Sequence, residues 1–211
     1  MGKKKLVITI GRQYGSGGTE IGRKLAKELD IEFYDKNILR MNSSESGIKE
    51  SYFHLVDEKA GDKLLYRIIS NLAPEIRKPS FGPDLISADN LFRFQSEVIR
   101  KLAEAESCVI AGRCADYILE DIPDLKLLRV YIYADFGTRV SRVLDRGLCP
   151  PQAVEQTIRR IDKERRDYYR YYTGRSWSDP VNYDLLINAS TAGIRGSIDL
   201  IKEYLRVLGL R

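Results

Sequence analysis

The chain has 211 residues, of which 43% are hydrophobic and 31% are charged, so we expect a single domain over residues 1–211. No apolar run approaches the length of a membrane span. A disulfide framework or a zinc site is not expected, because the chain has three cysteines without CxxC spacing and one histidine. The net charge of +5 suits an anionic partner, although a solvated surface with extra basic residues explains it equally well. The apolar run after the basic start is too short for a secretory signal, which favours reduced thiols and a cytoplasmic location.

The N-terminal half begins with a strand and a helix. Residues 6–10 are a β-branched apolar run, typical of a buried strand, and residues 19–29 carry apolar side chains at helical spacing. Residues 31–34 predict a second short strand. Residues 41–89 contain serine, glycine and three prolines, which indicates an inserted and largely helical segment. Helical spacing returns over residues 90–104.

The C-terminal half alternates strands with helices. In chain order, the predicted elements are strands at 108–111 and 127–133, helices at 136–145 and 151–172, a strand at 185–188 and a helix at 194–207. Strands that are apolar throughout and alternate with helices predict a parallel α/β sheet covered on both faces. Such sheets bind ligands beyond the carboxyl ends of their strands, here after Ile10, Ala111, Ala134 and Asn188.

A glycine cluster, GRQYGSGGT, follows the first strand at residues 11–19. Its glycines and the start of the next helix are suited to bind phosphate through main-chain N–H groups, and the residues predicted to do so for ATP are Gly15, Ser16, Gly17, Gly18 and Thr19. A plain strand-to-helix turn is the alternative.

The cluster departs from the phosphate-binding pattern G-x4-G-K-[ST]. If Gly17 is its second glycine, Gly18 stands in place of the lysine, and Thr19 keeps the hydroxyl that would contact Mg²⁺. We expect Arg12, inside the loop, to supply the missing charge, followed by Arg23 or Lys24.

Four segments in order resemble the cytidylate-kinase-like family of P-loop nucleoside monophosphate kinases: GRQYGSGGTEIGRKLAKEL, FYDKNIL, VIAGRCADYIL and IDKERRDYYRYYTGRSWSDPVNYDLLINAS. The resemblance covers nearly the whole chain and is weakest at 41–89. It implies a five-stranded parallel sheet in the order 2-3-1-4-5, helices on both faces, a monophosphate-binding insertion near 41–89 and a lid near 139–176. It also implies transfer of a phosphoryl group from ATP, with Mg²⁺, to CMP, dCMP or a related small molecule.

The resemblance also assigns an acceptor site. It implies that Arg113 holds the acceptor phosphate, that Asp167 and Arg170 contact the acceptor, and that Asp35 and Lys36 line its pocket. The family's aspartates on either side of Gly112-Arg113 are Ala111 and Cys114 here. Asp116 and Asp35 are candidate replacements for the acid that organises magnesium.

Arginines on the two helices after strand four are the remaining catalytic candidates. Phosphoryl transfer requires positive charge around the moving group, and guanidinium groups match phosphate oxygens. The resemblance favours Arg142, Arg166 and Arg170 for this role, in addition to Arg12, which is expected to replace the loop lysine. Arg159, Arg160 and Arg165 are interpreted as a solvated helix face paired with acidic neighbours.

Asn188 and Ser190, after the fifth strand, are candidates for the adenine site or for a helix cap. We interpret the tyrosines in Tyr168–Tyr172 as packing residues rather than a nucleic-acid platform, because consecutive residues point around a helix. Two functions follow from the sequence: a nucleotide kinase, or a nucleotide-binding module of the same fold that has lost activity with the loop lysine and the acid at Ala111. Nucleic-acid binding ranks far below both, since no RNA- or DNA-binding motif is present.

Overall fold

Five parallel strands form one sheet in the order β2-β3-β1-β4-β5, as predicted. The computed structural model describes residues 5–35 and 88–210. The strands are β1 (Leu6–Arg12), β2 (Glu32–Tyr34), β3 (Cys108–Ala111), β4 (Lys126–Tyr133) and β5 (Leu185–Asn188). The longer helices are α1 (Gly18–Leu29), α3 (Ala88–Ala105), α5 (Phe136–Asp145), α6 (Val154–Thr173) and α7 (Gly193–Val207).

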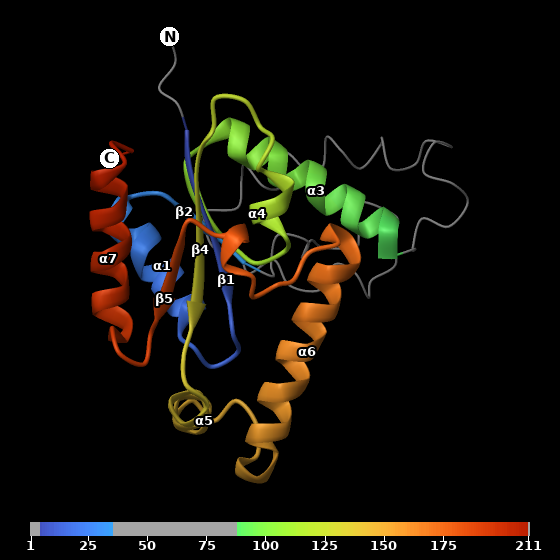
Figure 1. The fold of residues 1–211 in the computed structure, drawn as a ribbon, viewed down its shortest axis with the longest axis vertical. Helices are drawn as coiled ribbons and strands as arrows, with labels where there is room; N and C mark the ends of the chain where they lie inside the picture. Colours follow the sequence, from blue (N-terminus) through green and yellow to red (C-terminus); the bar gives the residue numbers. More distant parts are fainter. Residues whose placement is uncertain (1–4, 36–87, 211) are drawn as a thin grey trace, which may run out of the picture.

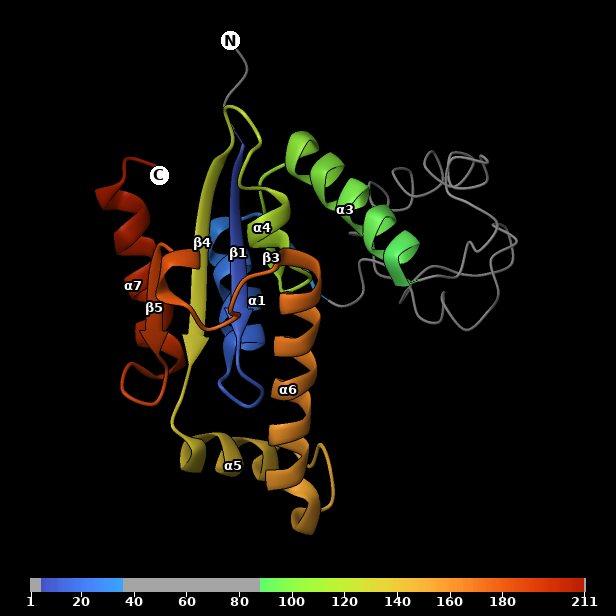
Figure 2. The ribbon, with the colours of Figure 1, turned by 45° about the vertical axis from the view of Figure 1, so that its right-hand side comes forward.

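Helices cover both faces of the sheet, because its inner strands are apolar on both sides. One core cluster packs α1 and α7 against residues such as Ile8, Ile10 and Val130, and the other packs α3 and α4 (Ala115–Ile118) against Val7 and Ile110. Figures 1 and 2 show these two layers, with α5 and α6 extending beyond the carboxyl ends of the strands.

A third, smaller core lies between α5 and α6. It buries Val143, Val154 and Ile158. The Asp135 carboxylate caps α5 by accepting a hydrogen bond from the Thr138 N–H at 2.8 Å, and Gly174, in the left-handed conformation, ends α6. The two helices therefore form a unit with its own core at the edge of the sheet where ligands are expected.

Three details differ from the sequence predictions. β1 runs to Arg12, because Gly11 and Arg12 continue the pairing with Tyr131 and Ile132 of β4. The helix predicted from residue 151 begins with a 3₁₀ turn (Pro151–Ala153), and α6 follows it. The short α4 and the 3₁₀ turn at Pro180–Asn182 were not predicted, since four- and three-residue helices have no measurable periodicity.

The predicted insertion at 41–89 lies outside the described residues, apart from the first residues of α3. Within the described ranges, every helix is too short or too polar to cross a membrane.

Candidate functional site

The loop after β1 forms a tight, glycine-dependent turn. Gly15 and Gly17 have φ values of 78° and 88°, in the left-handed region that favours glycine. Ser16 is fully buried beneath the turn, where its hydroxyl donates to the Gln13 carbonyl at 2.8 Å and accepts from the Gly18 N–H at 3.3 Å. Its side chain therefore fixes the turn from below.

This loop lines a cavity of about 220 Å³, which we call the loop cavity. Of the predicted phosphate-binding residues, Gly15, Gly17, Gly18 and Thr19 line it, and the buried Ser16 is not among the described lining residues. Because α1 begins at Gly18, N–H groups of its first turn, which have no partner within the helix, belong to the same wall. A helix N-terminus with glycine-rich backbone is suited to bind an anion.

Arg12 is the last residue of β1, not a loop residue as predicted, and its side chain explains the glycine at position 18. A Cβ atom on Gly18 would lie 2.5 Å from the Arg12 Cβ and 3.0 Å from its Cγ. Gly18 does not need positive φ, so the requirement for glycine comes from the lack of space for a Cβ, mainly because of Arg12 and to a lesser extent because of Ile132, whose Cβ would lie 3.2 Å away. The Arg12 side chain therefore occupies the space that a lysine at position 18 would need.

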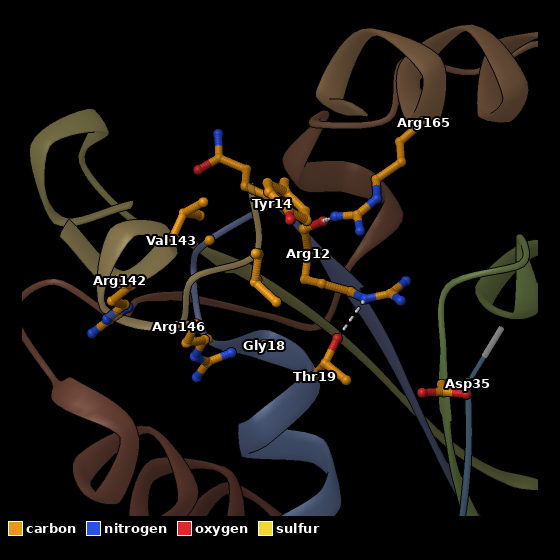
Figure 3. A pocket seen from close by; sticks show the side chains of 13 residues that line it. Arg12, Tyr14, Gly18, Thr19, Asp35, Arg142, Val143, Arg146 and Arg165 are labelled. Carbon is orange, nitrogen blue, oxygen red and sulfur yellow. Dashed lines mark hydrogen bonds between the residues drawn. The ribbon is translucent and has the colours of Figure 1, made fainter. Parts of the chain in front are cut away.

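The Arg12 guanidinium reaches from the phosphate loop to the turn after β3. Its Nε donates to the Thr19 hydroxyl at 3.4 Å, a weak hydrogen bond (Figure 3). Its Nη1 would lie 2.1 Å from a Cβ on Gly112. Burial, and then the charge of Arg165, lowers the pKa of Arg12 to about 9, while Asp35 acts in the opposite direction. A cation in this environment favours a bound anion.

Arg165 is a site residue that the sequence interpretation missed. Its Nη1 donates to the main-chain carbonyl of Arg12 at 2.7 Å, its guanidinium carbon lies 5.8 Å from the centre of the Tyr14 ring, and burial lowers its pKa. It lies on the buried stripe of α6, between Asp162 and Tyr169. The helical spacing of Val154, Ile158 and Asp162 indicates this stripe in the sequence. Arg165 was nevertheless interpreted as part of a solvated face, because its side chain is charged.

Arg142 and Arg146 also line the loop cavity. Arg142 donates to the carbonyl of Ser16 at 2.6 Å and to the carbonyl of Ala189 at 2.8 Å, so it ties the phosphate loop to the segment after β5. Arg146 pairs with Glu20 of α1. The predicted Arg142 is therefore at the site, held by main-chain oxygens.

The other predicted arginines of α6 lie elsewhere. Three predicted residues are exposed, and none is among the described residues that line the loop cavity or a second cavity at the carboxyl end of β3: Arg166, Asp167 and Arg170. Lys36 lies outside the described residues. The roles assigned to these four residues stay predictions.

A second cavity, of about 400 Å³, lies at the carboxyl end of β3, and we call it the β3 cavity. Arg113, the predicted acceptor-phosphate ligand, lines it, together with Asp116, Tyr168, Tyr169 and Trp177. Arg12 and Arg165 line both cavities, so their side chains form the boundary between the two.

The two candidate acids differ in their environments. Asp35 lines the loop cavity, with Arg23 Nη2 at 3.7 Å from its Oδ2. Asp116 lies in the β3 cavity and accepts a hydrogen bond from the Tyr169 hydroxyl at 2.6 Å, and burial raises its pKa. A raised pKa opposes metal binding, so Asp35 is the better candidate.

The donor set of the loop cavity fits a magnesium ion that arrives with a nucleotide. Mg²⁺ usually takes one or two protein oxygens and completes its shell with phosphates and water, and Thr19 and Asp35 offer a hydroxyl and a carboxylate on one cavity. Across residues 5–35 and 88–210, no cluster of three acidic, histidine or cysteine side chains could hold a metal without such a ligand.

Asn188 and Ser190 bind each other and a neighbouring loop. The Asn188 side-chain oxygen accepts from the Ser190 N–H at 3.0 Å, and the Ser190 hydroxyl accepts from the Asp135 N–H at 2.8 Å. Neither is among the described residues that line the two cavities. An adenine role for them stays a prediction.

Packing against the core was predicted for all four tyrosines of α6, and three of them pack in this way. Tyr172 stacks on Phe92 of α3 with ring centres 3.9 Å apart, Tyr169 is buried, and Tyr168 receives a hydrogen bond from Gln95 at 3.2 Å. Tyr171 is the exposed member, at 69%. The ring contacts fix α6 against α3, beside the β3 cavity.

Comparison with known proteins agrees with this architecture. A model of the cytidylate kinase-like family matches residues 7–191. The chain is 27% identical to a cytidylate kinase from Pyrococcus horikoshii over 207 residues, which cover 96% of this chain and 89% of that enzyme. A cytidylate kinase from Desulfurococcus amylolyticus is 32% identical over 114 residues, which span 54% of this chain and only 58% of that enzyme.

Among solved structures, an uncharacterized protein from Eubacterium ventriosum has 26% sequence identity and a TM-score of 0.68. The likeness covers 96% of this chain and 99% of that one.

Proposed function

The chain belongs to the cytidylate kinase-like family, and from this premise we propose that it transfers the γ-phosphoryl group of ATP to a nucleoside monophosphate, with CMP and dCMP as the leading acceptors. The observation that carries the proposal is the boundary between the two cavities. Two guanidinium groups, of Arg12 and Arg165, face both the cavity with the phosphate loop and the cavity with Arg113. Phosphoryl transfer needs such positive charge between donor and acceptor.

Each part of the site then has a role. The turn from Gly15 to Thr19 binds the triphosphate, Arg113 orients the acceptor phosphate, and Arg12 and Arg165 stabilise the charge that spreads over the transferred group. When bound, Mg²⁺ would neutralise phosphate charge, held by the Thr19 hydroxyl and the Asp35 carboxylate. Arg12, at the end of β1, supplies the positive charge that a loop lysine would otherwise supply.

The alternative is a nucleotide-binding module without turnover. The glycine at position 18 motivates it, and so does Ala111, which lies at the end of β3 where an acid would be expected. The half-buried guanidinium of Arg12 favours the kinase, because it restores a positive charge at the loop.

The deciding experiment measures ADP formation from ATP and Mg²⁺ with a panel of nucleoside monophosphates. We expect turnover with at least one pyrimidine monophosphate, and a loss of about 10³-fold in kcat/KM for Arg12→Met, as for other arginines that stabilise this transition state. Arg100→Met, at an exposed arginine of α3 paired with Glu97, is the control and should retain activity. ATP binding without turnover on any acceptor would support the module, and unchanged kinetics in Arg12→Met would refute the role of Arg12.

A further inference from the structure

One residue of the phosphate loop, Tyr14, has both of its main-chain groups bound by side chains of α5 and α6. Its N–H donates to the Asp162 carboxylate at 2.7 Å, and its carbonyl accepts from Arg139 Nη1 at 3.3 Å. Loop backbone is usually satisfied locally or by water. Here two residues more than 120 positions away in the sequence determine where this part of the loop lies.

The two side chains that bind Tyr14 form a buried ion pair. Arg139 and Asp162 are 10% and 7% exposed, and they contact each other directly. Arg139 Nε has no hydrogen-bond partner within the described part of the chain. A buried pair with an unsatisfied nitrogen is a poor source of stability, because desolvation cancels most of the attraction. Its evident effect is to hold Tyr14.

The Tyr14 ring belongs to the small core of α5 and α6. It packs in the cluster that buries Val143, Val154 and Ile158. The next residue is equally close, since a Cβ on Gly15 would lie 2.9 Å from the Arg139 carbonyl oxygen. The loop therefore contacts α5 and α6 in three ways: through the main-chain groups of Tyr14, through the Tyr14 ring and through the close approach of Gly15 to Arg139.

We propose that Asp162 is a positioning residue that couples the packing of α5 and α6 to the triphosphate-binding conformation of the loop. Asp162 acts through Tyr14 and does not itself touch the nucleotide. The loop takes its shape from helices that also carry Arg142 and Arg165, so the backbone and the guanidinium groups are placed together. The triphosphate as ligand rests on the proposed function, whereas the mechanical coupling does not.

The test compares Asp162 with a matched carboxylate. Asp184 makes contacts of the same kind away from the two cavities, in a more exposed pair, since it accepts from the Arg129 N–H at 2.8 Å and pairs with the Arg129 side chain at 2.7 Å. We expect Asp162→Ala to weaken ATP binding by about 10- to 100-fold in calorimetry, the range for a lost hydrogen bond to a charged group. Binding of the acceptor monophosphate should change little. Asp184→Ala should lower the melting temperature but leave the dissociation constant for ATP within about twofold.

A second readout needs no ligand. Hydrogen exchange at the Tyr14 amide of the nucleotide-free protein should accelerate at least tenfold in Asp162→Ala and not in Asp184→Ala. Asp162→Asn keeps an oxygen for this amide, so its values should lie between those of wild type and Asp162→Ala, and it carries the test if the alanine variant does not fold. Unchanged exchange and unchanged ATP affinity in the folded variants would overturn the inference. ATP binding without phosphoryl transfer in wild type would contradict only the proposed function.

Discussion

The two cavities that meet at Arg12 and Arg165 are built from different groups. The loop cavity is walled by glycine backbone, the first turn of α1 and the side chains of Arg12, Arg142, Arg146 and Arg165. The β3 cavity shares Arg12 and Arg165 and also contains Arg113, but it adds three aromatic rings, those of Tyr168, Tyr169 and Trp177, and the buried carboxylate of Asp116. Backbone and guanidinium groups recognise phosphate on any nucleotide, whereas rings and a carboxylate can distinguish one acceptor from another. Under the proposed function, the loop cavity binds the triphosphate, and the rings of the β3 cavity contribute to the choice of acceptor.

The strongest test of the loop cavity returns the lysine to its usual position. We expect Gly18→Lys to lower kcat/KM by about 10³-fold, because its Cβ would lie 2.5 Å from that of Arg12 and displace the guanidinium. The double variant Arg12→Gly/Gly18→Lys removes this overlap and should recover at least about tenfold of the loss, measured in the same ADP assay.

A lysine elsewhere on the surface provides the control. Gly196 lies in α7, where a Cβ would make only an ordinary 3.7 Å contact, so Gly196→Lys should have wild-type activity. Full activity of the single variant Gly18→Lys would show that Arg12 and a lysine can coexist, and that the overlap does not explain the glycine.

The boundary between the cavities is tested on α6. We expect Arg165→Met to lower kcat by about 10²-fold, as for the loss of one donor to a transition state, and more than Arg166→Met or Arg170→Met. Arg160→Met, at an exposed arginine paired with Glu164, is the matched control on the same helix. A larger loss in Arg166→Met or Arg170→Met would favour the residues that the sequence resemblance selected.

The smallest expected effect concerns the β3 cavity. Burial raises the pKa of Asp116 above its ordinary value of 3.8, so the folded state binds a proton that the unfolded state has already lost. This contribution to stability is fully present below the unfolded-state value and is lost as the pH rises through the folded-state value. At pH 8, far above the unfolded-state value, burial of the Asp116 carboxyl costs stability that a neutral amide would not cost, and Asp116→Asn should raise the free energy of unfolding by about 1 kcal/mol.

Urea denaturation at pH 8 and at pH 5 measures this difference, which should shrink at the lower pH. Asp116→Ala is the comparison variant, since it leaves the Tyr169 hydroxyl without its 2.6 Å acceptor and should be destabilised at both pH values. A less stable Asp116→Asn at pH 8 would contradict the raised pKa of Asp116.

Much of the fold was predictable, because strands buried on both faces leave uninterrupted apolar runs such as residues 108–111 and 185–188. The end of β1 was not predictable, because Gly11 and Arg12 interrupt the apolar run. They belong to the strand only through their pairing with β4. In the site, Gly15, Gly17 and Thr19 followed from glycine spacing. Arg165 did not, because the contact that defines it joins residues 153 positions apart.

The course of the Arg12 side chain has an evolutionary consequence. Gly18 adopts an ordinary helical backbone, so its lack of a side chain depends on the atoms around it, chiefly those of Arg12, whereas Gly15 and Gly17 are also required by their φ values. Positions 12 and 18 should therefore covary among natural relatives. Lineages that carry a long cation at the strand end should keep glycine at the helix start, and those that carry lysine there should have lost the arginine.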